Sequence, residues 1–201
     1  MGQGSYVFCE ADSIQEEYPQ YAAVVRDLET QVIAKCDVDW APRRCGFLAA
    51  SSNQYGRTTI MPELFDNHDS VPMTHWRQNF AGHAAGHRMI IQGRGTGEII
   101  PEDFKVAWLG LAFPNENMNI SEIKWQIGDR KYGRINIEEL KAYNKPAIVF
   151  EEGFIIDEET SFELYGYLTE ADYQRIVMLG AAYYKQIDRV LGDCGAAITS
   201  T

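Results

Sequence analysis

The sequence predicts a mainly β protein: an antiparallel β-sandwich, jelly-roll-like, with an N-terminal amphipathic helix. From residue 45 onward, apolar and polar residues alternate in stretches such as 122–127, which is typical of strands with one buried and one wet face. Such stretches recur roughly every ten to twenty residues between turn-like segments, which favours an antiparallel sandwich. Between residues 19 and 35, apolar residues instead recur at helical spacing.

The helical segment has one apolar stripe. Pro19 suits the first turn of a helix, and the residues that follow on one face are Tyr21, Val24, Val25, Leu28 and Val32. Such a stripe has two interpretations. The helix packs on its own domain, or it docks on a neighbouring subunit.

Several strands carry specific expectations. The segment 104–113 is apolar on both faces, so we expect it centrally between layers or under a partner. The segment 146–156 holds two apolar runs separated by a turn or bulge at residues 151–153. A short helical turn is expected at 136–143, and residues 181–191 are compatible with either helix or strand.

Length and composition set the remaining bounds. The 201 residues suit a single domain over 1–201, with an N-terminal helical segment at 1–44, the β-sandwich at 45–190 and a C-terminal tail at 191–201. The net charge of −11 argues against a direct nucleic-acid role. Apolar runs fall short of the roughly 20 residues of a bilayer span, so no transmembrane segment is predicted.

The ends of the chain and its cysteines bear on localisation. No signal peptide is predicted, so we expect cytoplasmic assembly, with a released virion as a further setting. The four cysteines form no CxxC pair, which favours reduced or buried thiols over disulfides.

Three of the four histidines lie within residues 75–89. His83 and His87, four residues apart, would share a helical face and bind a metal with His75 or His68 as a third ligand. The segment between them holds glycine and no acidic residue, which disfavours both a helix and a metallopeptidase motif. We therefore expect these histidines in a loop or at a strand end, without metal.

Other candidate sites have structural explanations. The glycine-rich segment 93–97 is interpreted as a hairpin tip. The acidic residues at 151–152 and 157–159 are interpreted as a solvated turn, or alternatively as a weak cation site between subunits. No nucleophile motif is found, so neither a catalytic residue nor a cofactor is predicted.

The stretch from Glu102 to Leu168, "EDFKVAWLGLAF … FELYGYL", resembles the β-sandwich of jelly-roll viral capsid and other virion structural proteins. The resemblance covers roughly residues 45–190 and rests on strand rhythm, long loops and an acidic chain. It implies a structural role. The cupins share the jelly-roll fold but bind metal through an HxH pair, where this chain has HxxxH.

We therefore expect a structural protein, a virion or capsid component, that assembles into a shell or filament with copies of itself and other structural proteins of the particle. The residues expected at subunit contacts are Val24, Val25, Leu28, Val32, Trp108, Tyr165, Tyr167, Tyr183 and Tyr184. One alternative is a binding module that recognises carbohydrate or a receptor through Trp40, Trp76 and the tyrosines. Another is a metal-dependent enzyme that uses His75, His83 and His87.

Overall fold

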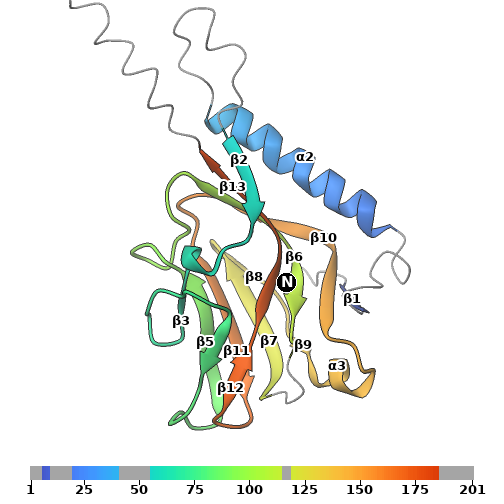
Figure 1. Ribbon diagram of the computed structural model, residues 1–201, viewed down its shortest axis with the longest axis vertical. Coiled ribbons are helices and arrows are strands. Elements are labelled where there is room, and N and C mark those ends of the chain that lie inside the picture. Colours follow the sequence, from blue (N-terminus) through green and yellow to red (C-terminus); the bar gives the residue numbers. More distant parts are fainter. Residues whose placement is uncertain (1–5, 10–19, 41–54, 115–118, 186–201) are drawn as a thin grey trace, which may run out of the picture.

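The computed structural model describes residues 6–9, 20–40, 55–114 and 119–185, and it confirms an antiparallel β-sandwich with one N-terminal helix (Figure 1). The elements are β1 (Tyr6–Cys9), α2 (Tyr21–Asp39), β2 (Tyr55–Thr59), the 3-10 helix η2 (Pro62–Leu64), β3 (Phe65–Asn67), β4 (Arg77–Asn79), β5 (Gly86–Gly93), β6 (Phe104–Ala112), β7 (Ile120–Ile127), β8 (Arg130–Lys131), β9 (Ile135–Asn136), α3 (Glu138–Ala142), β10 (Ala147–Ile156), β11 (Phe162–Leu168), β12 (Tyr173–Arg175) and β13 (Val177–Lys185).

Two sheets form the sandwich. Sheet 1 has the strand order β1-β10-β6-β13-β2, and sheet 2 has the order β3-β5-β11-β7-β8, with β9 also pairing with β7. The antiparallel pairs are nested along the chain: β2 pairs with β13, β5 with β11, β6 with β10 and β7 with β8. Nested pairing of this kind is a long hairpin rolled into two layers, which is the jelly-roll arrangement.

The main core lies between the sheets and is centred on Trp108. Its ring packs edge-on against three other aromatic rings, with centroid separations of 5.4 Å to Trp125, 4.8 Å to Phe150 and 5.3 Å to Phe162. Edge-to-face packing of this kind stabilises a core beyond the area it buries. Trp108 itself is fully buried.

Helix α2 covers the outer face of sheet 1, where it contacts β10, β6 and β13 (Figure 1). The buried side chains beneath it form a second apolar cluster: Leu28, Val32, Cys36, Trp40, Ala107, Leu109, Ala181 and Tyr183. Of the two interpretations of the apolar stripe, packing on its own domain therefore holds in this structure. The segment 104–113 is apolar on both faces because one face meets the core and the other meets the helix.

Strand β10 is continuous but carries a bulge where the sequence indicated a turn or bulge. Its pairing with β6 is interrupted between Val149 and Phe154. Gly153 within the bulge has φ +67, a left-handed conformation that glycine adopts without strain. A Cβ there would lie 2.6 Å from Leu28 Cδ2, so the bulge also allows the close approach of the helix.

Several smaller expectations are also met. Residues 138–142 form the short helix α3 in a connection, and residues 94–99 form a tight turn after β5. Residues 181–185 belong to strand β13, whereas the rest of 181–191 and the predicted tail lie outside the described residues. Within the described ranges, no helix has the length and apolar character that a bilayer span requires.

Candidate functional site

The histidine-rich segment does not form a helix. Residues 81–85 bend between β4 and β5, and His87 is exposed at the second position of β5. His87 Nδ1 lies 3.5 Å from Glu122 Oε1, and its ring packs on Tyr167 with a centroid separation of 5.0 Å. His75 is exposed in the segment before β4. Among the described residues, the structure therefore does not gather His75, His83 and His87 into one site, as the metal-dependent enzyme hypothesis required.

His83 instead lies beside His68 and Asp69, which belong to the turn after β3. The two imidazole rings are edge-on with centroids 4.8 Å apart. Asp69 Oδ2 lies 3.3 Å from His68 Nε2, and Asp69 Oδ1 lies 3.7 Å from His83 Nε2. One potential ligand atom from each of the three residues falls within 4.8 Å of the others. This group is suited to metal binding.

His68 is fixed from the side away from Asp69. Its side chain is 4% exposed, and its ring packs on the buried Phe80. Its Nδ1 lies 3.1 Å from Gln78 Oε1, within hydrogen-bond distance. Nε2 is buried and makes no hydrogen bond, and it faces the Asp69 carboxylate.

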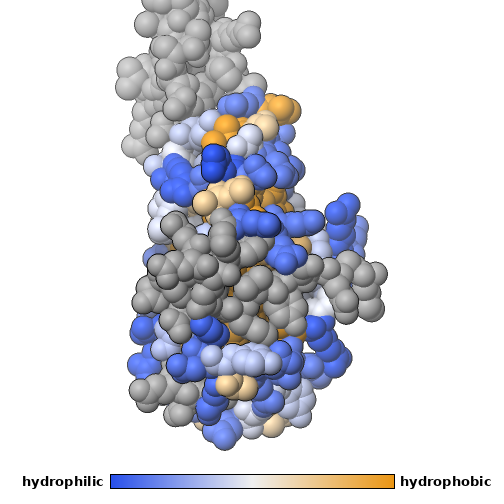
Figure 2. Space-filling view, turned by 90° about the vertical axis from the view of Figure 1, so that its right-hand side faces the viewer, coloured by the Kyte–Doolittle hydropathy of each residue, from blue (hydrophilic) through white to orange (hydrophobic). Residues whose placement is uncertain are grey.

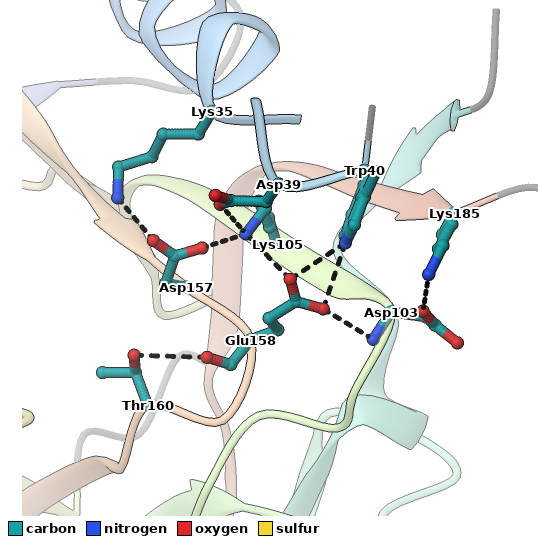
Figure 3. Close-up of polar contacts among 9 residues, drawn as sticks. All are labelled: Lys35, Asp39, Trp40, Asp103, Lys105, Asp157, Glu158, Thr160 and Lys185. Atoms are coloured by element: carbon teal, nitrogen blue, oxygen red, sulfur yellow. Dashed lines mark hydrogen bonds and ion pairs between the residues drawn. The ribbon is translucent and has the colours of Figure 1, made fainter. Parts of the chain in front are cut away.

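A second polar cluster surrounds Lys105 in β6, beneath the end of α2 (Figure 3). The Lys105 side chain is 1% exposed, and its Nζ forms ion pairs with Asp157, with Glu158 at 3.2 Å and with Asp39 at 2.8 Å. Lys35 also pairs with Asp157. Three carboxylates from two distant segments thus neutralise one buried ammonium, as buried charges require.

The neighbours of this cluster complete its hydrogen bonds. Trp40 Nε1 donates to both Glu158 oxygens, at 2.9 and 3.1 Å, and the backbone N–H of Asp103 donates to Glu158 Oε2 at 3.0 Å. Lys105 Nζ also lies 5.1 Å from the centre of the Trp40 ring, within cation–π range. The cluster fastens the helix to the sandwich.

Titration of the cluster follows from its packing. Burial disfavours the charged form of Lys105, but its hydrogen bonds to Asp157, Asp39 and Glu158 outweigh burial and raise the lysine pKa. Burial likewise opposes the charged form of Asp157, but Lys105 and Lys35 outweigh it and lower the carboxyl pKa. At neutral pH the Lys105–Asp157 pair is therefore charged.

This cluster corrects the interpretation of the acidic residues at 157–159 as a solvated turn. Asp157 and Glu158 are partners of a buried lysine, whereas Glu151 and Glu152 are exposed in the β10 bulge. The only feature of the sequence that indicates this buried ionic cluster is one lysine, Lys105, inside an otherwise apolar strand. That lysine needs a nearby acid, and the acids at 157–158 were candidates.

Four of the residues expected at subunit contacts pack inside the chain. Leu28, Val32, Trp108 and Tyr183 are at most 3% exposed. They have no surface to offer a second subunit, so this part of the expected interface does not hold for this fold. Their apolar character is explained by the two clusters on either side of sheet 1.

The other five keep exposed surface. Val24 and Val25 are half-buried on α2, Tyr184 is half-buried at the end of β13, and Tyr165 and Tyr167 lie on the outer face of sheet 2. The Tyr165 hydroxyl donates to Glu163 at 2.7 Å, and burial together with this carboxylate raises the pKa of Tyr165 to about 12. Trp40 is 3% exposed and so is not displayed to a ligand as the binding-module hypothesis required, whereas Trp76 is half-buried against Phe65.

A groove of about 430 Å³ runs between α2 and the β10 bulge. Its lining combines apolar and charged side chains: Val24, Asp27, Leu28, Gln31, Arg130, Tyr132, Glu151, Glu152, Gly153, Phe154 and Ile155. Figure 2 shows apolar residues gathered at the height of α2, while the lower part of the described surface on this face is mostly polar.

Comparison with known proteins identifies no family. No protein-family model and no curated protein matches the chain. Among solved structures, the chain is similar to an arabinose-bound GH51 α-L-arabinofuranosidase, MgGH51, at 11% identity and a TM-score of 0.29. The match covers 71% of this chain and 25% of the enzyme, and at that TM-score it carries no argument about function.

Proposed function

We propose that this protein is a structural subunit that assembles with copies of itself into a shell or filament, as a component of a virion or similar particle. The jelly-roll fold is compatible with this role but is shared with binding proteins and enzymes. The observation that carries the proposal is the edge of sheet 1, where the short strand β1 covers β10.

Strand β1 is joined to the sandwich through one neighbour. Among the described strands it pairs with β10 alone, in the register Tyr6–Phe150 to Cys9–Ala147. The β10 side chains in this register, residues 147–150, are at most 1% exposed. Without β1, the edge of a strongly apolar strand would present unpaired N–H and C=O groups.

The same backbone bonds form when β1 comes from a second copy, because strand addition to an open edge depends on the main chain. The nested pairs of the sandwich would remain unchanged by such an exchange. If each copy gives β1 to the next, the contact is head-to-tail. Head-to-tail contacts close into rings or continue as filaments.

The test is a cross-link between the facing positions of β1 and β10. Directly opposite residues of an antiparallel pair have Cα atoms about 4.5–5.5 Å apart, within the range of a disulfide. Ala147→Cys therefore places a thiol opposite Cys9. The variant also carries Cys45→Ser and Cys194→Ser, and the matched control adds Cys9→Ser.

After mild oxidation, the proposal expects covalent dimers and larger species on non-reducing gels, absent from the Cys9→Ser control. Light scattering of the uncross-linked parent, at tens of micromolar, is expected to give a multimer. A cross-link found only within single chains, or a strictly monomeric parent, would overturn the proposal.

A second candidate is a binding module for carbohydrate, which the outer face of sheet 2 favours. Tyr165 and Tyr167 lie there with His87 and Glu163, and Tyr167 is 37% exposed. An exposed ring beside polar groups suits a sugar, which has an apolar face and many hydroxyls. A glycan array probed with the parent and with Tyr167→Ala separates this candidate, which requires a signal that the variant loses.

A further inference from the structure

We propose that His68, Asp69 and His83 bind one divalent transition-metal ion, with Zn²⁺ as the best match. The three residues come from two loops, the turn after β3 and the bend before β5, which are separated in the sequence by β4 and adjacent in space. Neither the assembly proposal nor the binding-module candidate depends on this site.

The spacing of the ligand atoms agrees with one ion between them. Zinc bonds of about 2.0–2.1 Å in tetrahedral geometry place neighbouring ligand atoms about 3.3–3.4 Å apart. The observed separations are 3.3 Å between His68 Nε2 and Asp69 Oδ2, and 3.7 Å between His83 Nε2 and Asp69 Oδ1. These two contacts use different oxygens of the Asp69 carboxylate, and one ligand atom from each of the three residues lies within 4.8 Å of the others.

A second observation that points to a metal ion, independent of the ligand spacing, comes from His68. Its Nε2 is buried, has no hydrogen-bond partner and faces the other two residues. A buried nitrogen without a partner is rare in native proteins and calls for an unseen partner. The contact of Nδ1 with Gln78 Oε1 fixes the orientation of the ring with Nε2 toward the site, and metal-binding histidines are oriented by this kind of outer contact.

The turn that carries Asp69 is held in place before any ion binds. Asn67 Oδ1 accepts hydrogen bonds from the backbone N–H of Asp69 at 2.9 Å and of Val71 at 3.1 Å. Across the site, the backbone N–H of His83 donates to the carbonyl of the buried Phe80 at 3.1 Å. Ligands on braced loops lose little freedom on binding, which favours affinity.

The donor set selects the class of ion. Two imidazoles and one carboxylate suit Zn²⁺, Co²⁺ or Ni²⁺, whereas Mg²⁺ and Ca²⁺ prefer oxygen ligands. Asp69 is 56% exposed and His83 is 24% exposed, so an ion reaches the site from solvent. An ion held there would join the two loops at one end of sheet 2.

The test uses the full chain, treated with EDTA and dialysed. Titration calorimetry with ZnCl₂ is expected to show one site per chain, and cobalt should give a visible absorption band. His83→Ala and Asp69→Asn are expected to weaken zinc binding at least tenfold. Loss of an outer-shell partner of a metal ligand already costs about 10–100-fold in affinity, and these variants remove a ligand itself. Mg²⁺ should give no signal. His68 is left intact because its burial makes a substitution there a folding risk.

His87→Ala is the matched control. His87 lies close to His83 in the sequence, but its side chain contacts Glu122 and Tyr167 and not the proposed site. Its zinc affinity is expected to equal that of the parent. Circular dichroism confirms that each variant is folded. No zinc binding by the parent, or equal affinity in the parent and both ligand variants, would overturn the proposal.

Discussion

Lys105 Nζ lies 2.8 Å from Asp39 Oδ2, so the last turn of α2 is tied by charge to the central strand of sheet 1. Asp157 and Glu158 reach the same ammonium from the segment after β10. One lysine therefore joins the helix, a central strand and a turn. The apolar cluster under the helix and this ionic cluster both attach α2 to sheet 1.

Lys105→Met removes the charge and keeps much of the side-chain volume. We expect it to lower the free energy of unfolding by about 3 kcal/mol, the low end for a broken buried pair, because the carboxylates left behind are partly exposed. Urea denaturation measures the change. Lys185→Met, which removes an exposed pair with Asp103, should cost about 1 kcal/mol or less. Equal effects of the two variants would contradict this prediction.

The acid limb of stability should depend on Asp157. Its folded pKa lies below that of the unfolded chain, about 3.9, so its contribution is complete above roughly pH 4 and is lost as the pH falls through the folded pKa. Asp157→Asn should therefore be less stable at pH 7, with the gap to the parent closing below pH 4. Urea unfolding across pH 2–7 tests it, and Asp129→Asn, an exposed turn residue, should show no such closing gap.

Cys36 should be inert in the folded protein. It is fully buried beneath α2, and burial raises the pKa of its thiol to about 11. At pH 8 only about one thiol in a thousand would be ionised, and reagent access is blocked as well. Timed iodoacetamide alkylation with peptide mass spectrometry should find Cys36 unmodified until denaturant is added. Rapid labelling under native conditions would mean that the helix is not docked as described.

Leu28→Ala separates packing within the chain from packing between subunits. Leu28 is 3% exposed, so the truncation should lower the free energy of unfolding by about 2–4 kcal/mol without changing oligomeric state. Val38→Ala, on the same helix at 76% exposure, should stay within about 0.5 kcal/mol of the parent. A change in assembly with unchanged stability would restore Leu28 as a contact residue.

The fold could be predicted because its signals are local. Alternation in β7 marks one face as buried, and the stripe from Tyr21 to Val32 marks a helix. The helix extends to Asp39, beyond the expected end at residue 35, because the apolar stripe continues through Cys36 and Trp40 at the same spacing. Alternation alone does not give the nested strand pairing, since any order of alternating strands gives the same pattern; the jelly-roll-like arrangement was expected from the resemblance to virion sandwich proteins.

The polar sites could not be predicted because their members are far apart in the sequence. Lys105 is separated by 52 residues from Asp157 and by 53 from Glu158. His83 and His87 match a metal motif only if the segment is helical, and the segment bends instead. The partner of His83 is His68, which belongs to another loop and shares no spacing rule with it.

The position of α2 in the chain bears on the order of folding. The helix is made before strands β2 to β13, yet its contacts with Asp157 and Glu158 span 122 residues from Lys35 and 118 from Trp40. During synthesis, the strands on which α2 packs are therefore missing until most of the sandwich has emerged. Contacts of such long range form slowly, and a neighbouring nascent chain has time to accept the helix first.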